Sequence, residues 1–243
     1  MPIWILPDEL GEIPDGKMPT AKQIYSFFYG TIPVKLLDYA QTQTATLNRI
    51  ESAIYHYQIM DVAYGFGTVG DYPRQHFVAR TEMNAIVLNL MGAFDCIAHE
   101  INMVFNLPIP ERNVMFGHTH FGGRDNCIIC RVSYMHLTLS TYLEQIVASS
   151  WFNELKEYRN HIHKRLPVIQ VAIVVGGGNG RRVTLPDNPS NYNPQSSDYS
   201  RRLEIQAYCR DRIDDVINAI EHIYQLMHGK IAEYVTIQRD SSI

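Results

Sequence analysis

The chain has 243 residues, of which 46% are hydrophobic and 19% are charged, proportions that are usual for a soluble globular protein. Its formal net charge of −4 argues against an architectural or histone-like binder of nucleic acids. These values leave open a locally basic site, because the binding of a charged ligand depends on where the charges lie.

Prolines and glycines recur throughout residues 1–19, and this pattern predicts an irregular N-terminal arm. This arm lacks the basic lead and the apolar run of a signal peptide. No window of the chain reaches the roughly 18 apolar residues of a membrane span. We therefore expect a cytoplasmic protein without a membrane segment.

Apolar residues at helical spacing predict a series of helices in the first half of the chain. A short helix is expected from Thr20 to Tyr29, followed by a long one over about 34–62. The next helix starts near Thr81 and ends before Pro108. We expect an irregular connection over residues 108–133.

A further long helix is predicted from about Tyr134 to Leu166, because one apolar stripe runs along it. The stripe comprises Leu143, Ile146, Val147, Ser150, Trp151, Leu155, Tyr158 and Ile162. Residues 168–185 read as two strands around a glycine-rich turn, which predicts a β-hairpin. We interpret 186–199 as a flexible linker, place the last helix between about Ser200 and Tyr234, and take 236–243 as a tail.

The predicted fold class is therefore all-α, an antiparallel helical bundle with a small hairpin inserted before the last helix. A single domain is expected over residues 20–235.

Arg159 and His163 are the most informative residues, since they lie one helical turn apart and can converge on one ligand. A permanently charged guanidinium beside an imidazole that titrates near neutral pH suits a phosphate ester. A second interpretation needs no ligand. Cations in the last turn of a helix interact favourably with its carbonyl end, and Pro167 supplies a stop signal.

The segment Tyr158-Arg159-Asn160-His161-Ile162-His163-Lys164-Arg165 resembles the signature of the HEPN superfamily, an Arg, often an Asn, and a His near the end of a bundle helix. The stretch from Phe94 to Asn102 is similar to the partner helix of that family. The resemblance covers roughly residues 82–166 and the closing helix from about 201.

The resemblance implies a metal-independent endoribonuclease without a cofactor, of the toxin or defence kind. His163 is then the general base or acid, Arg159 stabilises the charge on the phosphorane, and Asn160 orients the phosphate. Asp95 holds the arginine or histidine in place, unless it pairs with His99 on its own helix. Residues expected to contact the substrate are His99, His161, Lys164 and Arg165. The family's sites form across a symmetric homodimer, and an antitoxin protein is a possible partner.

Only three residues separate Arg159 from His163, one fewer than the usual minimum of the family. Two alternatives follow. Either the site works at a spacing of one turn, or the chain is a non-catalytic dimerisation or nucleotide-binding module with a degenerate motif.

A second cluster combines two histidines with a Cys-x2-Cys pair, the ligand types of a tetrahedral zinc site. Its members are His118, His120, Cys127 and Cys130. Their order is not one of the usual zinc-finger spacings, and cysteines beside isoleucines are often simply buried. We therefore expect no bound metal and keep zinc only as a weak alternative.

Overall fold

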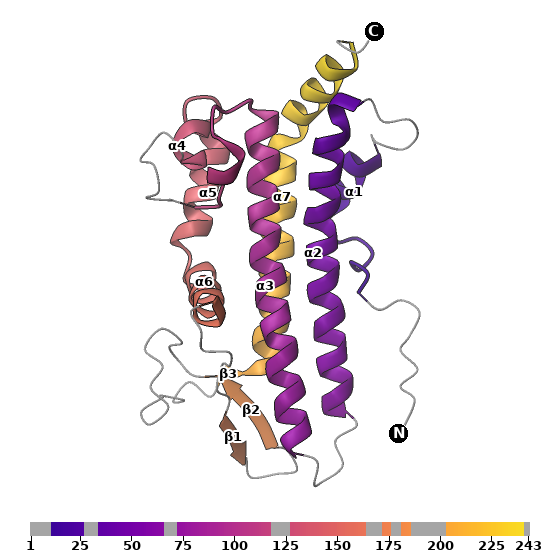
Figure 1. The fold of residues 1–243 in the computed structure, drawn as a ribbon, viewed down its shortest axis with the longest axis vertical. Helices are drawn as coiled ribbons and strands as arrows, with labels where there is room; N and C mark the ends of the chain where they lie inside the picture. Colours follow the sequence, from indigo (N-terminus) through magenta and orange to yellow (C-terminus); the bar gives the residue numbers. More distant parts are fainter. Residues whose placement is uncertain are drawn as a thin grey trace. The chain divides into compact units, whose positions relative to one another are not determined.

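The computed structural model describes residues 11–26, 34–65, 72–117, 127–163, 172–175, 181–185 and 203–240. Within these ranges the chain is an all-α bundle with a small β-hairpin before the last helix, which confirms the predicted fold class (Figure 1). The elements are α1 (Pro19–Ser26), α2 (Val34–Gly65), α3 (Tyr72–Val104), η1 (Glu111–Asn113), α4 (Ile128–Val132), α5 (Leu137–Ala148), α6 (Ser150–His163), β1 (Ala172–Val175), β2 (Arg181–Leu185), β3 (Leu203–Glu204) and α7 (Ile205–Asp240).

Several boundaries differ from those expected. The helix α3 begins at Tyr72, nine residues before the predicted start at Thr81. The connection over 108–133 is partly helical, because it contains η1 and α4. The prediction of one helix from Tyr134 to Leu166 was wrong, since Ser149 interrupts it with an extended backbone (φ −67°, ψ 145°) and α5 and α6 result.

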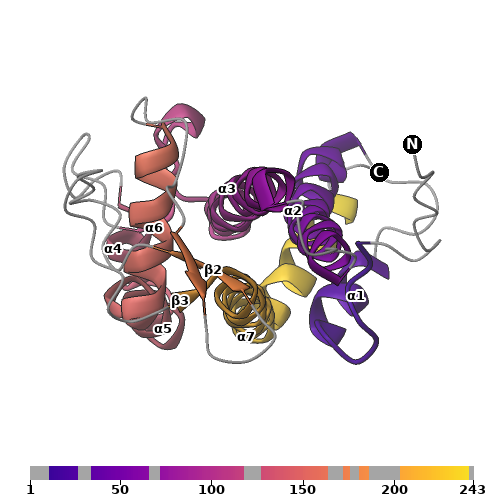
Figure 2. The ribbon, with the colours of Figure 1, turned by 90° about the horizontal axis from the view of Figure 1, so that it is seen from below.

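The three strands form one antiparallel sheet in the order β1-β2-β3. Ile173 pairs with Val183 in the predicted hairpin, and Leu185 pairs with Leu203 of β3. Because β3 leads directly into α7, the sheet is tied to the start of that helix (Figure 2).

The chain divides into two compact units, and the long helices contribute residues to both. The first unit comprises Met1–Ile13, Ile50–Met91 and Glu154–Asp214, and the second comprises Pro14–Arg49, Gly92–Asn153 and Asp215–Ile243. The single domain expected over 20–235 stays a prediction.

In the second unit, aromatic rings from α3, the segment after η1, and α6 pack around Phe94, which is fully buried. Its ring centroid lies 4.6 Å from that of Phe116 and 5.2 Å from that of Phe152. The latter pair meets edge to face, a geometry that adds to the hydrophobic gain of burying both rings. Aromatic packing therefore joins the C-terminal part of α3 to the start of α6.

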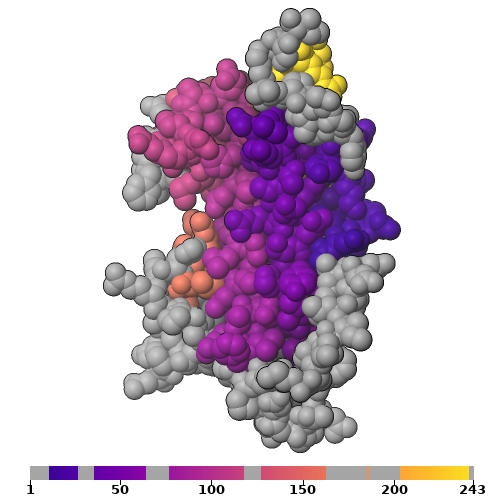
Figure 3. All heavy atoms as spheres, turned by 45° about the vertical axis from the view of Figure 1, so that its right-hand side comes forward, coloured from indigo at the N-terminus to yellow at the C-terminus, as the bar shows by residue number. Residues whose placement is uncertain are grey.

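Helices α2 and α3 lie side by side in the space-filling view (Figure 3), and polar pairs between them occur in both units. In the part of the chain that the structure describes, no helix combines the length and the apolar character that crossing a membrane requires.

Candidate functional site

The Arg-Asn motif lies in the last turns of α6, whose buried stripe consists of Phe152, Leu155 and Tyr158. These residues recur every three positions and face the core, as helical geometry requires. Arg159 and Asn160, which directly follow the stripe, are half-buried. The first two residues of the motif therefore lie at the edge of the buried stripe of α6.

The other motif residues are placed differently. His161 continues the buried stripe and is only 8% exposed. His163 is the last residue of α6, so it lies one turn beyond Arg159 on the helix backbone. The side chain of His163 and the whole of Lys164 and Arg165 lie outside the described residues, so their expected roles stay predictions.

Helix α7 anchors α6 next to the motif within the first unit. The rings of Tyr158 and Tyr208 meet edge to face with centroids 5.3 Å apart. The Arg212 guanidinium lies 5.3 Å from the centre of the Tyr208 ring, and its Nη1 lies 3.9 Å from Oε2 of Glu154. Because Glu154 and Tyr158 follow each other along α6 while their partners run backwards along α7, the two helices are antiparallel.

The Tyr208 phenol stays protonated within this group. Burial raises its pKa well above the ordinary value, and the nearby Tyr158 and Glu154 raise it further, while Arg212 opposes the shift. Tyr208 therefore contributes its neutral ring to the packing of α7 against α6 at neutral pH. These contacts with α7 fix the position of the α6 backbone next to Arg159.

Asp95 and His99 lie one turn apart on α3, and both are half-buried. They belong to the second unit, whereas Arg159 belongs to the first. The expectation that Asp95 faces the motif therefore stays a prediction.

A buried polar cluster around Glu100 was not anticipated from the sequence. Glu100 is fully buried, and its Oε1 accepts hydrogen bonds from the Thr46 hydroxyl at 2.6 Å and the Tyr224 hydroxyl at 2.9 Å. Burial raises the pKa of Glu100 to about 7, while hydrogen bonds from Thr46, Tyr224 and Tyr39 act in the opposite direction. A signal was present in the sequence, since Glu100 falls on the same helix face as Ile97 and Ile101.

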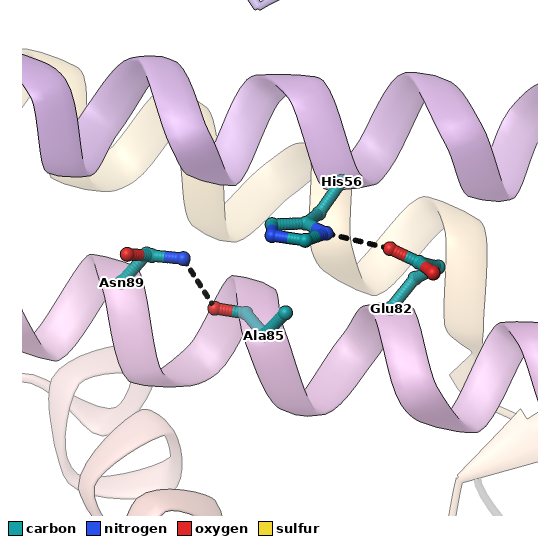
Figure 4. A network of polar contacts seen from close by, with 4 residues as sticks. All are labelled: His56, Glu82, Ala85 and Asn89. Carbon is teal, nitrogen blue, oxygen red and sulfur yellow. Dashed lines mark hydrogen bonds and ion pairs between the residues drawn. The ribbon is translucent and has the colours of Figure 1, made fainter.

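A second unanticipated pair joins α2 to α3 in the first unit (Figure 4). Nδ1 of His56 donates a 2.6 Å hydrogen bond to Oε2 of Glu82, and the two side chains are 29% and 15% exposed. A carboxylate that holds an imidazole in this way fixes its orientation, as second-shell groups do around histidine bases and ligands. Nearby, the Asn89 amide donates to the Ala85 carbonyl of its own helix.

The cysteine pair of the suggested zinc cluster lies at the start of α4. Cys127 is buried and caps the helix, because its Sγ accepts the backbone N–H of Cys130 at 3.3 Å. His118 and His120 lie outside the described residues. Among the residues that the structure describes, no three His, Cys, Asp or Glu side chains are grouped to hold a metal ion.

No family model matches the chain, and neither the search of curated proteins nor the search of solved structures finds a significant match. The resemblance to the HEPN superfamily therefore stays a prediction from the sequence.

Proposed function

We propose that the chain is a HEPN-like RNA-binding protein that cleaves RNA without a metal ion, in the manner of a toxin or defence ribonuclease. One observation carries the proposal. Helix α6 ends at His163 and carries Arg159 one turn earlier, half-buried beside the fully buried Tyr158. One helix thus carries both residues of the proposed acid–base and phosphate-binding pair.

In the proposed reaction, the 2′-oxygen of a ribose attacks the adjacent phosphorus and the bond from phosphorus to the 5′-oxygen breaks. A base removes the proton of the 2′-hydroxyl and an acid protonates the leaving 5′-oxygen, so the products are a cyclic phosphate and a 5′-hydroxyl. His163 supplies one of these proton transfers. The Arg159 guanidinium stabilises the negative charge on the phosphorane, and Asn160 orients the phosphate.

Each copy of the chain contributes one motif, and we propose that two copies pair as a homodimer in the cytoplasm. The proposed dimer supplies the second proton-transfer group from the partner copy, and Asp95 supports the motif from α3. His99, His161, Lys164 and Arg165 are proposed to contact the RNA. The basic side chains concentrate positive charge at the motif in a chain of net charge −4. An antitoxin protein that covers this surface is a proposed partner.

The experiment compares RNA cleavage by the wild type with cleavage by Arg159→Ala and His163→Ala in the presence of a metal chelator. We expect each variant to lose at least a hundredfold in rate, and the wild-type products to end in a cyclic phosphate. Matched controls are Arg210→Ala and His222→Ala, which remove exposed side chains of α7 outside the motif. The proposal fails if the pure wild type cleaves no RNA, or if the motif variants cleave as fast as the controls.

A second candidate function is a non-catalytic dimerisation or nucleotide-binding module. The position of the motif favours it, because cations in the last turns of α6 interact with the carbonyl end of the helix without any ligand. In that case Arg159→Ala destabilises the fold by roughly 0.5–1 kcal/mol, and the wild type shows no cleavage.

A further inference from the structure

Cys127 is the N-cap residue of α4 and Cys130 lies in the first turn of this helix, in the second unit. The Cys127 carbonyl accepts the N–H of Arg131 at 3.0 Å, which places Cys127 at the base of the first helical turn. The Cys127 sulfur points along the same turn, because it accepts the N–H of Cys130 at 3.3 Å. The two thiols therefore lie within one helical turn of each other.

This arrangement meets the geometric requirement for a disulfide. Helix geometry brings the Cα atoms of residues three positions apart to about 5 Å. Disulfide-bonded cysteines have Cα atoms roughly 4.4–6.8 Å apart, so a bond between the two sulfurs needs rotation of the side chains but little movement of the backbone.

We propose that Cys127 and Cys130 form a dithiol site that is oxidised reversibly by disulfide-bonded small thiols. Nothing in the proposed ribonuclease chemistry uses this pair, so the inference stands independently of that function. The same two cysteines were candidate zinc ligands, but a disulfide between them needs no third ligand.

The different exposure of the two thiols sets the order of the steps. Cys127 is 3% exposed, whereas Cys130 is half-buried and can be reached from solvent. The Cys130 thiolate attacks one sulfur of the oxidant, whose sulfur–sulfur bond breaks and releases the first small thiol. Cys127 then loses its proton and attacks the Cys130 sulfur, which releases the second small thiol. Two protons and two electrons thus pass from the cysteines to the oxidant.

The other two cysteines are less suited to this reaction. Cys209 is fully buried, and burial raises the pKa of its thiol. Cys96 is half-buried on α3, and burial also raises the pKa of its thiol, an effect that the charge of Arg49 opposes. Burial raises the pKa of the Cys127 thiol as well, to about 11, so a raised pKa does not by itself set Cys96 and Cys209 apart. They differ because neither has a second cysteine one helical turn away in the sequence.

The test incubates the native full-length protein with oxidised glutathione, blocks the remaining thiols, and maps the products by mass spectrometry. We expect the wild type to lose two hydrogen atoms and retain no glutathione, with the bond between Cys127 and Cys130. Cys127→Ser keeps an oxygen that can cap α4, and this variant should retain one glutathione on Cys130. Cys130→Ser should retain at least tenfold less glutathione than Cys127→Ser.

A control variant with Cys96→Ser and Cys209→Ser should form the bond as the wild type does, and adding a reducing agent should restore both thiols. The proposal is overturned if the wild type keeps a stable glutathione on Cys130, or if Cys130 bonds to Cys96. Equal yields of the Cys127–Cys130 bond in native protein and in denaturant would also overturn it, because the folded geometry would then contribute nothing.

Discussion

The Thr46 hydroxyl on α2 donates a 2.6 Å hydrogen bond to Oε1 of Glu100 on α3, and neither side chain has any exposed surface. The Tyr224 hydroxyl of α7 donates to the same oxygen at 2.9 Å. One carboxyl thus joins three helices of the second unit. A buried polar cluster of this kind favours one register of the helices, because a shift would leave the carboxyl without its donors.

Glu100 should make the protein less stable as the pH rises towards neutrality. Burial raises the pKa of Glu100 from 4.5 to about 7, so between these values the folded state holds more protons than the unfolded state. The free energy of unfolding then falls as the pH rises through this window. At about 1.4 kcal/mol per pH unit the full change is roughly 3 kcal/mol.

Denaturant unfolding of the wild type and Glu100→Gln across this window measures the effect. Gln keeps the size of the side chain but does not titrate, so its stability relative to the wild type should increase with pH. Glu233→Gln, on an exposed side chain of α7, is the control and should follow the wild type. A difference between Glu100→Gln and the wild type that stays constant with pH would contradict the prediction.

Tyr224→Phe should shift this pH dependence and lower stability. The variant removes a hydrogen bond that favours the charged form of Glu100, so the pKa of Glu100 should rise further and the loss of stability should move to higher pH. Where Glu100 is charged, the lost hydrogen bond should cost about 1.5–3 kcal/mol, and where the carboxyl is protonated it should cost about 0.5–1.5 kcal/mol. Unfolding curves at several pH values measure both effects, and Tyr134→Phe, on a side chain that is 87% exposed, should change neither.

Glu221→Ala should destabilise the first turn of α1. The Glu221 carboxylate accepts the backbone N–H groups of Thr20 at 3.0 Å and Ala21 at 3.2 Å, which a helix cannot satisfy internally in its first turn. Losing this cap should cost roughly 2 kcal/mol. Hydrogen exchange should become faster at these two amides, while Glu233→Ala leaves it unchanged. Unaltered exchange in Glu221→Ala would show that the cap is dispensable.

The long helices could be predicted from the sequence because their apolar spacing persists over about thirty residues. The interruption at Ser149 could not, since the apolar stripe continues through it and the break depends on local hydrogen bonds. The Ser149 hydroxyl accepts the N–H of Phe152, and the Asn153 amide donates to the Val147 carbonyl. Such short-range polar contacts compete with helix continuation without disturbing the hydrophobic pattern.

The motif on α6 could be located from the sequence because Arg159 and His163 depend only on helical spacing. Glu100 could not be assigned its partners, since Thr46 and Tyr224 lie 54 and 124 residues away along the chain. The same holds for His56 and Glu82, which meet only when α2 and α3 pack together. Contacts between residues that are far apart along the chain form only when the helices pack, so the periodicity of the sequence does not indicate them.

Gly229→Ala should stabilise the protein. Gly229 lies in α7, is exposed, and has no atom within 4 Å of the position that a Cβ would take. Alanine restricts the unfolded chain and favours the helix by about 0.5–1 kcal/mol relative to glycine. Gly92→Ala in α3 is the matched comparison, because its Cβ would lie 3.2 Å from Nε of Arg49. A higher melting temperature is expected for Gly229→Ala, and a smaller gain or a loss for Gly92→Ala.

Gly11→Ala should destabilise the first unit more than Gly16→Ala destabilises the second. Both glycines have a positive φ, +90° and +77°, which costs an alanine about 1–2 kcal/mol. Only at Gly11 would a Cβ also collide, at 3.0 Å from the Cβ of Tyr55 and 3.2 Å from the carbonyl oxygen of Glu51, whereas nothing lies within 4 Å at Gly16. Relieving the collision should also break the 2.7 Å hydrogen bond from the Gly11 N–H to the Gln58 side chain. Denaturant unfolding measures the loss of stability in each variant. Both variants carry the backbone strain, so the difference between them reports the cost of the collision. Equal losses of stability would show that the chain moves aside at Gly11 without cost.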